Sequence, residues 1–265
     1  MNTEKQFHIG LSKTDGARYA LLPGDPGRVL EIAGYLEQPA FVAQKREFTT
    51  YAGLIAGERV LVTSTGIGGP SAAIALEELC HIGVDTIVRV GTCGGMQKSV
   101  SAGDLVLPTA AVRMEGTSRE YMPLEYPAAA DFSITAALAQ AARDNALAYH
   151  TGVIQSKDSF YGQHSPDSMP VSNELNYKWQ AWIKAGVLAS EMECAALFTV
   201  ASVRGIRAGA VLTALWNQEN GGTGDTCIPS SENAIRTAAG ALCRLIEKDK
   251  LKNKANCGEN TDGTI

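Results

Sequence analysis

The segment 85–95 places one arginine inside an apolar run and puts a hydroxyl and several glycines shortly after it. Arg89 lies within the run Ile-Val-Arg-Val, where a cation is costly unless it meets an anion. Thr92 and the backbone N–H groups around it would lie at the carboxyl end of a strand, and such groups suit a phosphate or a similar oxyanion. The plainer alternative is an ordinary strand exit with the arginine paired to a carboxylate. The segment alone does not choose between the two.

A second cation stands at the start of a predicted helix. Asp25 is a good N-cap, and Pro26 suits the first turn of a helix that we expect to run through about Leu36. Arg28 falls in that first turn, where a cation opposes the helix dipole unless it faces an anion. Arg28 is therefore a second phosphate candidate, with a solvated surface arginine as the alternative.

Two carboxylates, Glu191 and Glu193, flank Met192 between a predicted short strand and an apolar helix at 194–203. Acidic residues at a helix start are favoured by the helix dipole, which explains them without any function. A carboxylate can also accept hydrogen bonds from both hydroxyls of a vicinal diol. The functional interpretation of this pair is therefore ribose binding.

Two other segments combine glycine with polar side chains. The segment 66–71 is similar to a dinucleotide-binding loop, but Ser71 fills its last position and the acid expected after the next strand is missing. We reject a Rossmann cofactor site and expect these glycines to let the loop pack beside a ligand or a neighbouring subunit. The segment 156–166 is predicted to be a polar, aromatic loop, which is where binding groups tend to lie.

Strands and helices alternate along the chain without a linker, which predicts a single α/β domain over 1–250. The polar segment 251–265 is predicted to be a disordered tail. Strands are expected at 19–22, 47–55, 60–64, 86–90, 104–107, 149–155, 187–190 and 207–216, and the other helices at 72–80, 134–145, around 179–182 and at 231–248.

Composition restricts the class of partner. A net charge of −5 gives no basic footprint for nucleic acid or a membrane surface, so small-molecule substrates fit better. The six cysteines show no metal-ligand spacing, which favours reduced thiols and a cytoplasmic location. We also expect no signal peptide, because the first residues are polar, and no membrane-spanning segment.

Several motifs together resemble the nucleoside phosphorylase family, and most closely its bacterial uridine phosphorylase branch, over roughly residues 7–248. Any one motif is weak, but seven in order at matching spacing are specific. They are Pro23-Gly24-Asp25-Pro26, Arg46-Glu47-Phe48-Thr49-Thr50, the segment from Ser64 to Ser71, Arg89-Val90-Gly91-Thr92, Phe160-Tyr161, Gly162-Gln163 and Glu191-Met192-Glu193.

The resemblance implies an α/β fold with a distorted, partly barrel-like mixed sheet, and the replacement of a nucleoside base by phosphate at C1′. The expected substrates are uridine and inorganic phosphate, and no metal or organic cofactor is required. Arg89, Gln163 and Glu193 are implied as catalytic residues. The implied phosphate-binding residues are Gly24, Arg28, Arg89 and Thr92, with Arg46 from a neighbouring subunit.

The same resemblance assigns the other subsites. Glu191, Met192 and Glu193 would hold the ribose, and His8 of a neighbour would reach its 5′-hydroxyl. Phe160 would pack against a ring while Gln163 faces the amide-like edge of the base. Cys93 is interpreted as structural. A monovalent cation such as K⁺ would lie between subunits at Glu47, Ile67 and Ser71. A shared site requires at least a dimer, and the family suggests a hexamer built as a trimer of dimers.

Two departures leave recognition of the base open. The arginines expected in this branch at two positions near the base are replaced by Ser165 and Gln218. We hypothesise that His164 or Lys157 supplies the missing donor; the alternative is that both point to solvent and a water fills the gap.

Three rival functions remain. A purine or broad-specificity phosphorylase is disfavoured because the acid expected near Asn217 has no match. A nucleosidase would not need Arg28, Arg46 and Arg89 together. A non-catalytic nucleoside-binding protein on the same fold is the rival from another class.

Overall fold

One mixed sheet of ten strands runs through the part of the chain that the computed structural model describes, residues 4–221 and 230–258. Its strands are β1 (Tyr19–Pro23), β2 (Glu37–Lys45), β3 (Phe48–Ile55), β4 (Glu58–Thr63), β5 (Thr86–Gly95), β6 (Leu105–Met114), β7 (Ala128–Ala129), β8 (Tyr149–Lys157), β9 (Ala189–Glu191) and β10 (Arg207–Asn217). The helices are α1 (Pro26–Ala33), α2 (Gly69–His81), α3 (Thr117–Tyr121), α4 (Phe132–Asp144), α5 (Phe160–His164), α6 (Ser172–Lys184), α7 (Cys194–Arg204) and α8 (Glu232–Gly258).

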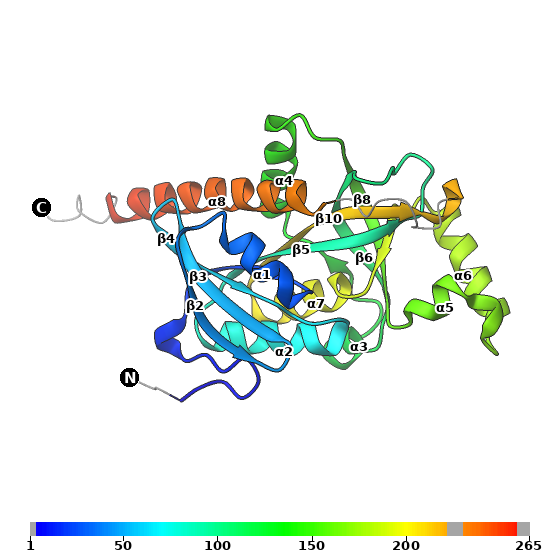
Figure 1. The fold of residues 1–265 in the computed structure, drawn as a ribbon, viewed down its shortest axis with the longest axis horizontal. Coiled ribbons are helices and arrows are strands. Elements are labelled where there is room, and N and C mark those ends of the chain that lie inside the picture. Colours follow the sequence, from blue (N-terminus) through cyan, green and yellow to red (C-terminus); the bar gives the residue numbers. More distant parts are fainter. Residues whose placement is uncertain (1–3, 222–229, 259–265) are drawn as a thin grey trace, which may run out of the picture.

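Helices cover both faces of this sheet (Figure 1). Successive residues of a strand point to opposite faces, so a strand covered on both sides is apolar throughout. Strand β1 shows this: Ala20 and Leu22 enter the core that contains α2 and α7, whereas Tyr19 and Leu21 enter the core that contains α1, α4 and α8. The apolar strands predicted from the sequence are therefore the central ones.

Strand β5 occupies the centre of the sheet and closes part of it into a barrel. It pairs in parallel with β1 and β10 and antiparallel with β9. From β10 the path continues through β6 and β8 to β9, which returns to β5. This closed path confirms the predicted single α/β fold with a partly barrel-like sheet. The parallel pairing of β1 with β5 puts their carboxyl ends on one side of the molecule.

Several predicted boundaries were wrong, among them the end of the strand expected at 104–107, which continues to Met114 as β6. Helix α1 ends at Ala33 rather than near Leu36, with Gly34 as its C-cap. The expected loop at 156–166 contains the end of β8 and a short helix, α5, whose N-cap Ser159 accepts a hydrogen bond from the Gly162 N–H. Helix α8 continues to Gly258, so residues 251–258 belong to it; the rest of the predicted tail, 259–265, lies outside the described residues.

In the described residues, no helix combines the length and apolar character needed to cross a membrane.

Candidate active site

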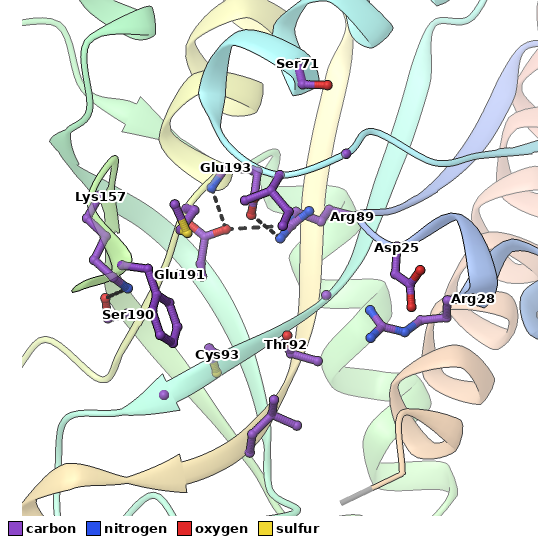
Figure 2. Close-up of a pocket in the computed structure, with 18 of the residues that line it drawn as sticks. Asp25, Arg28, Ser71, Arg89, Thr92, Cys93, Lys157, Ser190, Glu191 and Glu193 are labelled. Atoms are coloured by element: carbon purple, nitrogen blue, oxygen red, sulfur yellow. Dashed lines mark hydrogen bonds and ion pairs between the residues drawn. The ribbon is translucent and has the colours of Figure 1, made fainter. Parts of the chain in front are cut away.

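A cavity of about 620 Å³ opens at the carboxyl ends of β1 and β5. The loops that follow β1, β4 and β9 form part of its wall, and α5 contributes Phe160 and His164. In Figure 2, Asp25 and Arg28 lie at one end of the cavity and Lys157 and Ser190 lie at the other. The Arg89 guanidinium and its carboxylate partners lie between these ends, so the cavity has two chemically distinct ends and a charged middle.

Arg89 is buried and holds two carboxylates in the middle of the cavity. Its Nη2 donates a hydrogen bond to Glu193 Oε2, and its Nε lies 3.3 Å from Glu191 Oε2. Burial opposes the charge of this guanidinium, but Glu193 and Glu191 outweigh burial and raise the pKa of Arg89. Its Nη1 is buried without a hydrogen-bond partner among the described residues. A buried N–H left in this way is costly unless a ligand completes it.

The two carboxylates have different roles. Glu191 accepts hydrogen bonds from the backbone N–H groups of Glu193 and Cys194, at 2.9 and 3.0 Å, and therefore caps the start of α7. Glu193 instead accepts from the Gly68 N–H at 2.6 Å and pairs with Arg89. Burial raises the pKa of Glu193, and the Arg89 guanidinium acts against that rise. The hydrogen bonds of Glu191 thus agree with a structural role at the start of α7, which does not account for Glu193.

The predicted phosphate-binding groups of one chain lie along the cavity from its Arg28 end to Arg89 in the middle. Gly24, Arg28, Arg89 and Thr92 all line it. Arg28 is half-buried and forms no ion pair within the described residues, and burial lowers its pKa, with Arg89 adding to that effect. A Cβ on Gly24 would lie 3.2 Å from the Gly66 carbonyl oxygen, so glycine allows the loops after β1 and β4 to approach. Two cations facing one cavity favour an anion between them.

Arg46 and His8 do not line the cavity of their own chain. Arg46 is exposed in the turn between β2 and β3, with a φ of 55°. His8 is held by Glu78, whose carboxylate accepts from the backbone N–H groups of His8 and Ile9 and lies 2.7 Å from His8 Nδ1. Their expected action on a neighbouring subunit therefore stays a prediction. Glu78 fixes the segment that carries His8, a positioning role that the sequence did not reveal.

The predicted base-binding residues divide between two cavities. Phe160, His164 and Lys157 line the main cavity. Gln163 lines an adjacent cavity of about 370 Å³, which also contacts Lys157 and His164. Helix α5 turns Gln163 toward Gln218, to which its Nε2 donates at 3.0 Å. The structure thus brings three of the four residues to the main cavity and puts the fourth beside it.

Two further lining residues, Trp216 and Ser190, were missed from the sequence. The Trp216 ring lies 5.6 Å from the His164 ring and 6.4 Å from the Phe160 ring, so three aromatic side chains form one wall. Trp216 pairs with Gly94 across β10 and β5. Trp216 lies near the end of β10, beside the strand that carries Arg89. That position could have identified Trp216 as a site residue, but only once the strand order was known.

The three residues expected to hold a monovalent cation also lie on the main cavity. Ser71 Oγ donates to Glu47 Oε1 at 2.9 Å, so a hydroxyl and a carboxylate are already together. Cys93 lines the cavity too, but burial raises the pKa of its thiol. A neutral, buried thiol is a poor nucleophile, which agrees with a structural role.

A family model described as the phosphorylase superfamily matches residues 18–248. The chain belongs to the phosphorylase superfamily. Among its relatives, the uridine phosphorylase of Treponema pallidum is 51% identical over 94% of this chain and 97% of its own. The uridine phosphorylase of Escherichia coli is 40% identical over 93% of this chain and all of its own. A guanosine phosphorylase of Halorubrum lacusprofundi is 39% identical over 91% and 99%.

Proposed function

We propose that the protein is a uridine phosphorylase, which converts uridine and phosphate reversibly to uracil and ribose 1-phosphate in pyrimidine nucleoside salvage. The observation that carries the proposal is the Arg89 centre: Arg89 lines the same cavity as Arg28 and Glu193, and its buried Nη1 has no hydrogen-bond partner among the described residues. Relatives named uridine phosphorylase that match nearly the whole chain support the choice of substrate.

The reaction replaces the bond from C1′ to N1 of the base with a bond from C1′ to a phosphate oxygen. Arg28, Arg89 and Thr92 hold the phosphate, and the glycine at position 24 lets the backbone approach it. Glu193 and Met192 orient the ribose between the two ends. The sugar becomes positively charged in the transition state, so its position relative to phosphate matters more than any covalent partner on the protein.

A nucleoside panel, incubated with and without phosphate and followed by ultraviolet absorbance, tests this proposal. We expect uridine cleavage that depends on phosphate. Cleavage of guanosine or inosine instead would support a purine phosphorylase. That function is the second candidate because the Halorubrum relative is named a guanosine phosphorylase. Cleavage without phosphate would indicate a nucleosidase, and binding without turnover would indicate a non-catalytic nucleoside-binding protein.

Arg46 and His8 complete the site from a neighbouring subunit in this proposal, so the enzyme is at least a dimer and assembles as a hexamer, a trimer of dimers. The absence of both residues from the lining of the cavity in their own chain supports this. Mixing Arg46→Ala with Arg89→Ala subunits tests it, because exchange creates some sites with both arginines intact. Recovered activity in the mixture is expected; inactivity after proven exchange would contradict a shared site.

A monovalent cation, K⁺, binds at Glu47, Ile67 and Ser71 between subunits in the same proposal, and no other cofactor is required. Oxygen ligands suit such a cation, and the contact between Ser71 and Glu47 supports the assignment. We expect K⁺ to raise the midpoint of thermal unfolding of wild-type protein but not of Glu47→Ala; an equal rise in both would contradict the site. We place the enzyme in the cytoplasm, and cell fractionation would test this.

A further inference from the structure

Lys157 lies at the end of β8 and starts a chain of hydrogen bonds that ends at Gln218. Its Nζ donates to Ser190 Oγ at 2.7 Å, and Ser190 Oγ donates to Gln163 Oε1 at 2.6 Å. Gln163 Nε2 then donates to Gln218 Oε1 at 3.0 Å. The serine hydroxyl therefore accepts from the lysine and donates to the glutamine, which fixes the position of the ammonium group.

The Lys157 ammonium group is buried but forms no ion pair within the described chain. Lys157 is 6% exposed, and Ser190 Oγ is the hydrogen-bond acceptor of its Nζ in that part of the chain. The nearby carboxylates of Glu191 and Glu193 are paired with Arg89 instead. An ammonium group has three donors, so two remain for a ligand. Burying an unpaired charge is expensive, and such groups concentrate at functional sites.

The Lys157 ammonium group lies at the end of the cavity where the proposed reaction places its leaving group. Lys157 lines the main cavity, and Figure 2 shows it at the end opposite Arg28. A nucleophile attacks C1′ from the side opposite the bond that breaks. With phosphate at the Arg28 end, the departing base lies at the Lys157 end, where its ring reaches Phe160.

We propose that Lys157 hydrogen-bonds to a carbonyl oxygen of the pyrimidine and stabilises the negative charge that the base acquires, and that Ser190 positions Lys157 for this. The inference rests on the proposed uridine phosphorylase activity. The electron pair of the C1′–N1 bond moves to N1 and is shared with the carbonyl oxygens, while a phosphate oxygen forms the new bond to C1′. Lys157 keeps its proton throughout, and the uracil anion takes a proton from water.

His164, the other residue at this end, has a packing role. Its ring lies 4.2 Å from the Phe160 ring and 5.6 Å from the Trp216 ring. Burial lowers the pKa of His164, and Lys157 adds to this, so both effects favour the neutral imidazole. The charge at the base end comes from the lysine.

Lys157→Met tests the inference, with Lys157→Arg to retain the charge and Lys184→Met, on the exposed end of α6, as a matched control. We expect Lys157→Met to lower kcat/KM for uridine by roughly 100-fold, the usual effect of losing one donor to a developing charge. Lys157→Arg should retain part of the activity. Lys184→Met should match wild type.

Comparison of two substrates separates charge stabilisation from general damage. The base of 5-fluorouridine is a more acidic leaving group than uracil, so its departure depends less on stabilisation of the negative charge by the protein. Lys157→Met should therefore lose less activity on 5-fluorouridine than on uridine, and Ser190→Ala should show the same difference with a smaller total loss. Equal losses on both substrates would overturn the proposal, as would unchanged activity of Lys157→Met. A wild-type protein inactive on uridine would instead reject the proposed function itself.

Discussion

Replacing Lys157 by methionine should make the protein more stable while making it less active. The lysine is charged at neutral pH although it is buried, and burial lowers its pKa from 10.5 to about 8. Each unit of pKa shift corresponds to about 1.4 kcal/mol, so the charged lysine destabilises the folded state by about 3 kcal/mol. Methionine has a similar length and carries no charge to desolvate.

The destabilisation by Lys157 should depend on pH in a defined direction. The folded lysine loses its proton near pH 8, whereas the unfolded lysine keeps it until about pH 10.5. The destabilisation is therefore fully present below pH 8 and fades as the pH rises toward 10.5. From these two pKa values, about 2 of the 3 kcal/mol should disappear between pH 7.5 and pH 9.5.

Urea unfolding of wild type and Lys157→Met, at equal protein concentration and without substrate, measures the effect. Burial also raises the pKa of Cys93 and of Cys194 in both proteins, and Lys157 acts against that rise at Cys93. The difference between the two free energies of unfolding therefore reports Lys157 together with its effect on its neighbours. The reasoning is refuted if that difference stays constant with pH, or if wild type is the more stable protein at pH 7.5.

Three further changes have defined outcomes. Arg89→Met leaves the buried carboxylates of Glu191 and Glu193 unpaired. We therefore expect the free energy of unfolding, measured with urea, to fall by about 3–5 kcal/mol and phosphorolysis to be lost. A fall below about 1 kcal/mol would contradict the pairing. Phosphate at 100 times its Kd should stabilise wild type by about 2.7 kcal/mol, and Arg28→Ala should abolish this gain with little effect on the unliganded protein. Gly24→Ala puts a Cβ 3.2 Å from the Gly66 carbonyl oxygen and should raise the KM for phosphate, whereas Gly240→Ala, with an ordinary 3.6 Å contact, should not.

The candidates for the phosphate site could be predicted because their signals are local, and the family resemblance was needed to join them into one site. Arg89 and Thr92 lie three residues apart on one strand, and Arg28 follows the cap of its own helix. The parallel pairing of β1 with β5, which brings their carboxyl ends to one edge, came from the structure. The fold was predictable for a related reason: apolar strands alternate with amphipathic helices along the chain.

The base end could not be predicted in the same detail because its contacts depend on strand pairing. Lys157 and Ser190 meet because β8 and β9 run parallel with Ser156 opposite Glu191, a register that neither segment specifies alone. Gln163 was assigned to the base from a segment interpreted as a loop, but the α5 helix turns it toward Gln218. One turn of helix is enough to move a side chain from one cavity to the next.

The distribution of charge along the main cavity follows from the reaction that we propose. Phosphorolysis brings negative charge in with phosphate and moves part of it onto the departing base, so each end of the cavity needs a cation. A cation already neutralised by a protein carboxylate would attract that charge less strongly. Within the described chain, the cations at the two ends, Arg28 and Lys157, form no ion pairs, whereas Arg89 in the middle is paired with both carboxylates. The two cations at the ends are thus available to the charge that moves. Arg89 is held in place by both carboxylates and still has its Nη1 without a partner in the described residues, so it can order the site and contact the phosphate.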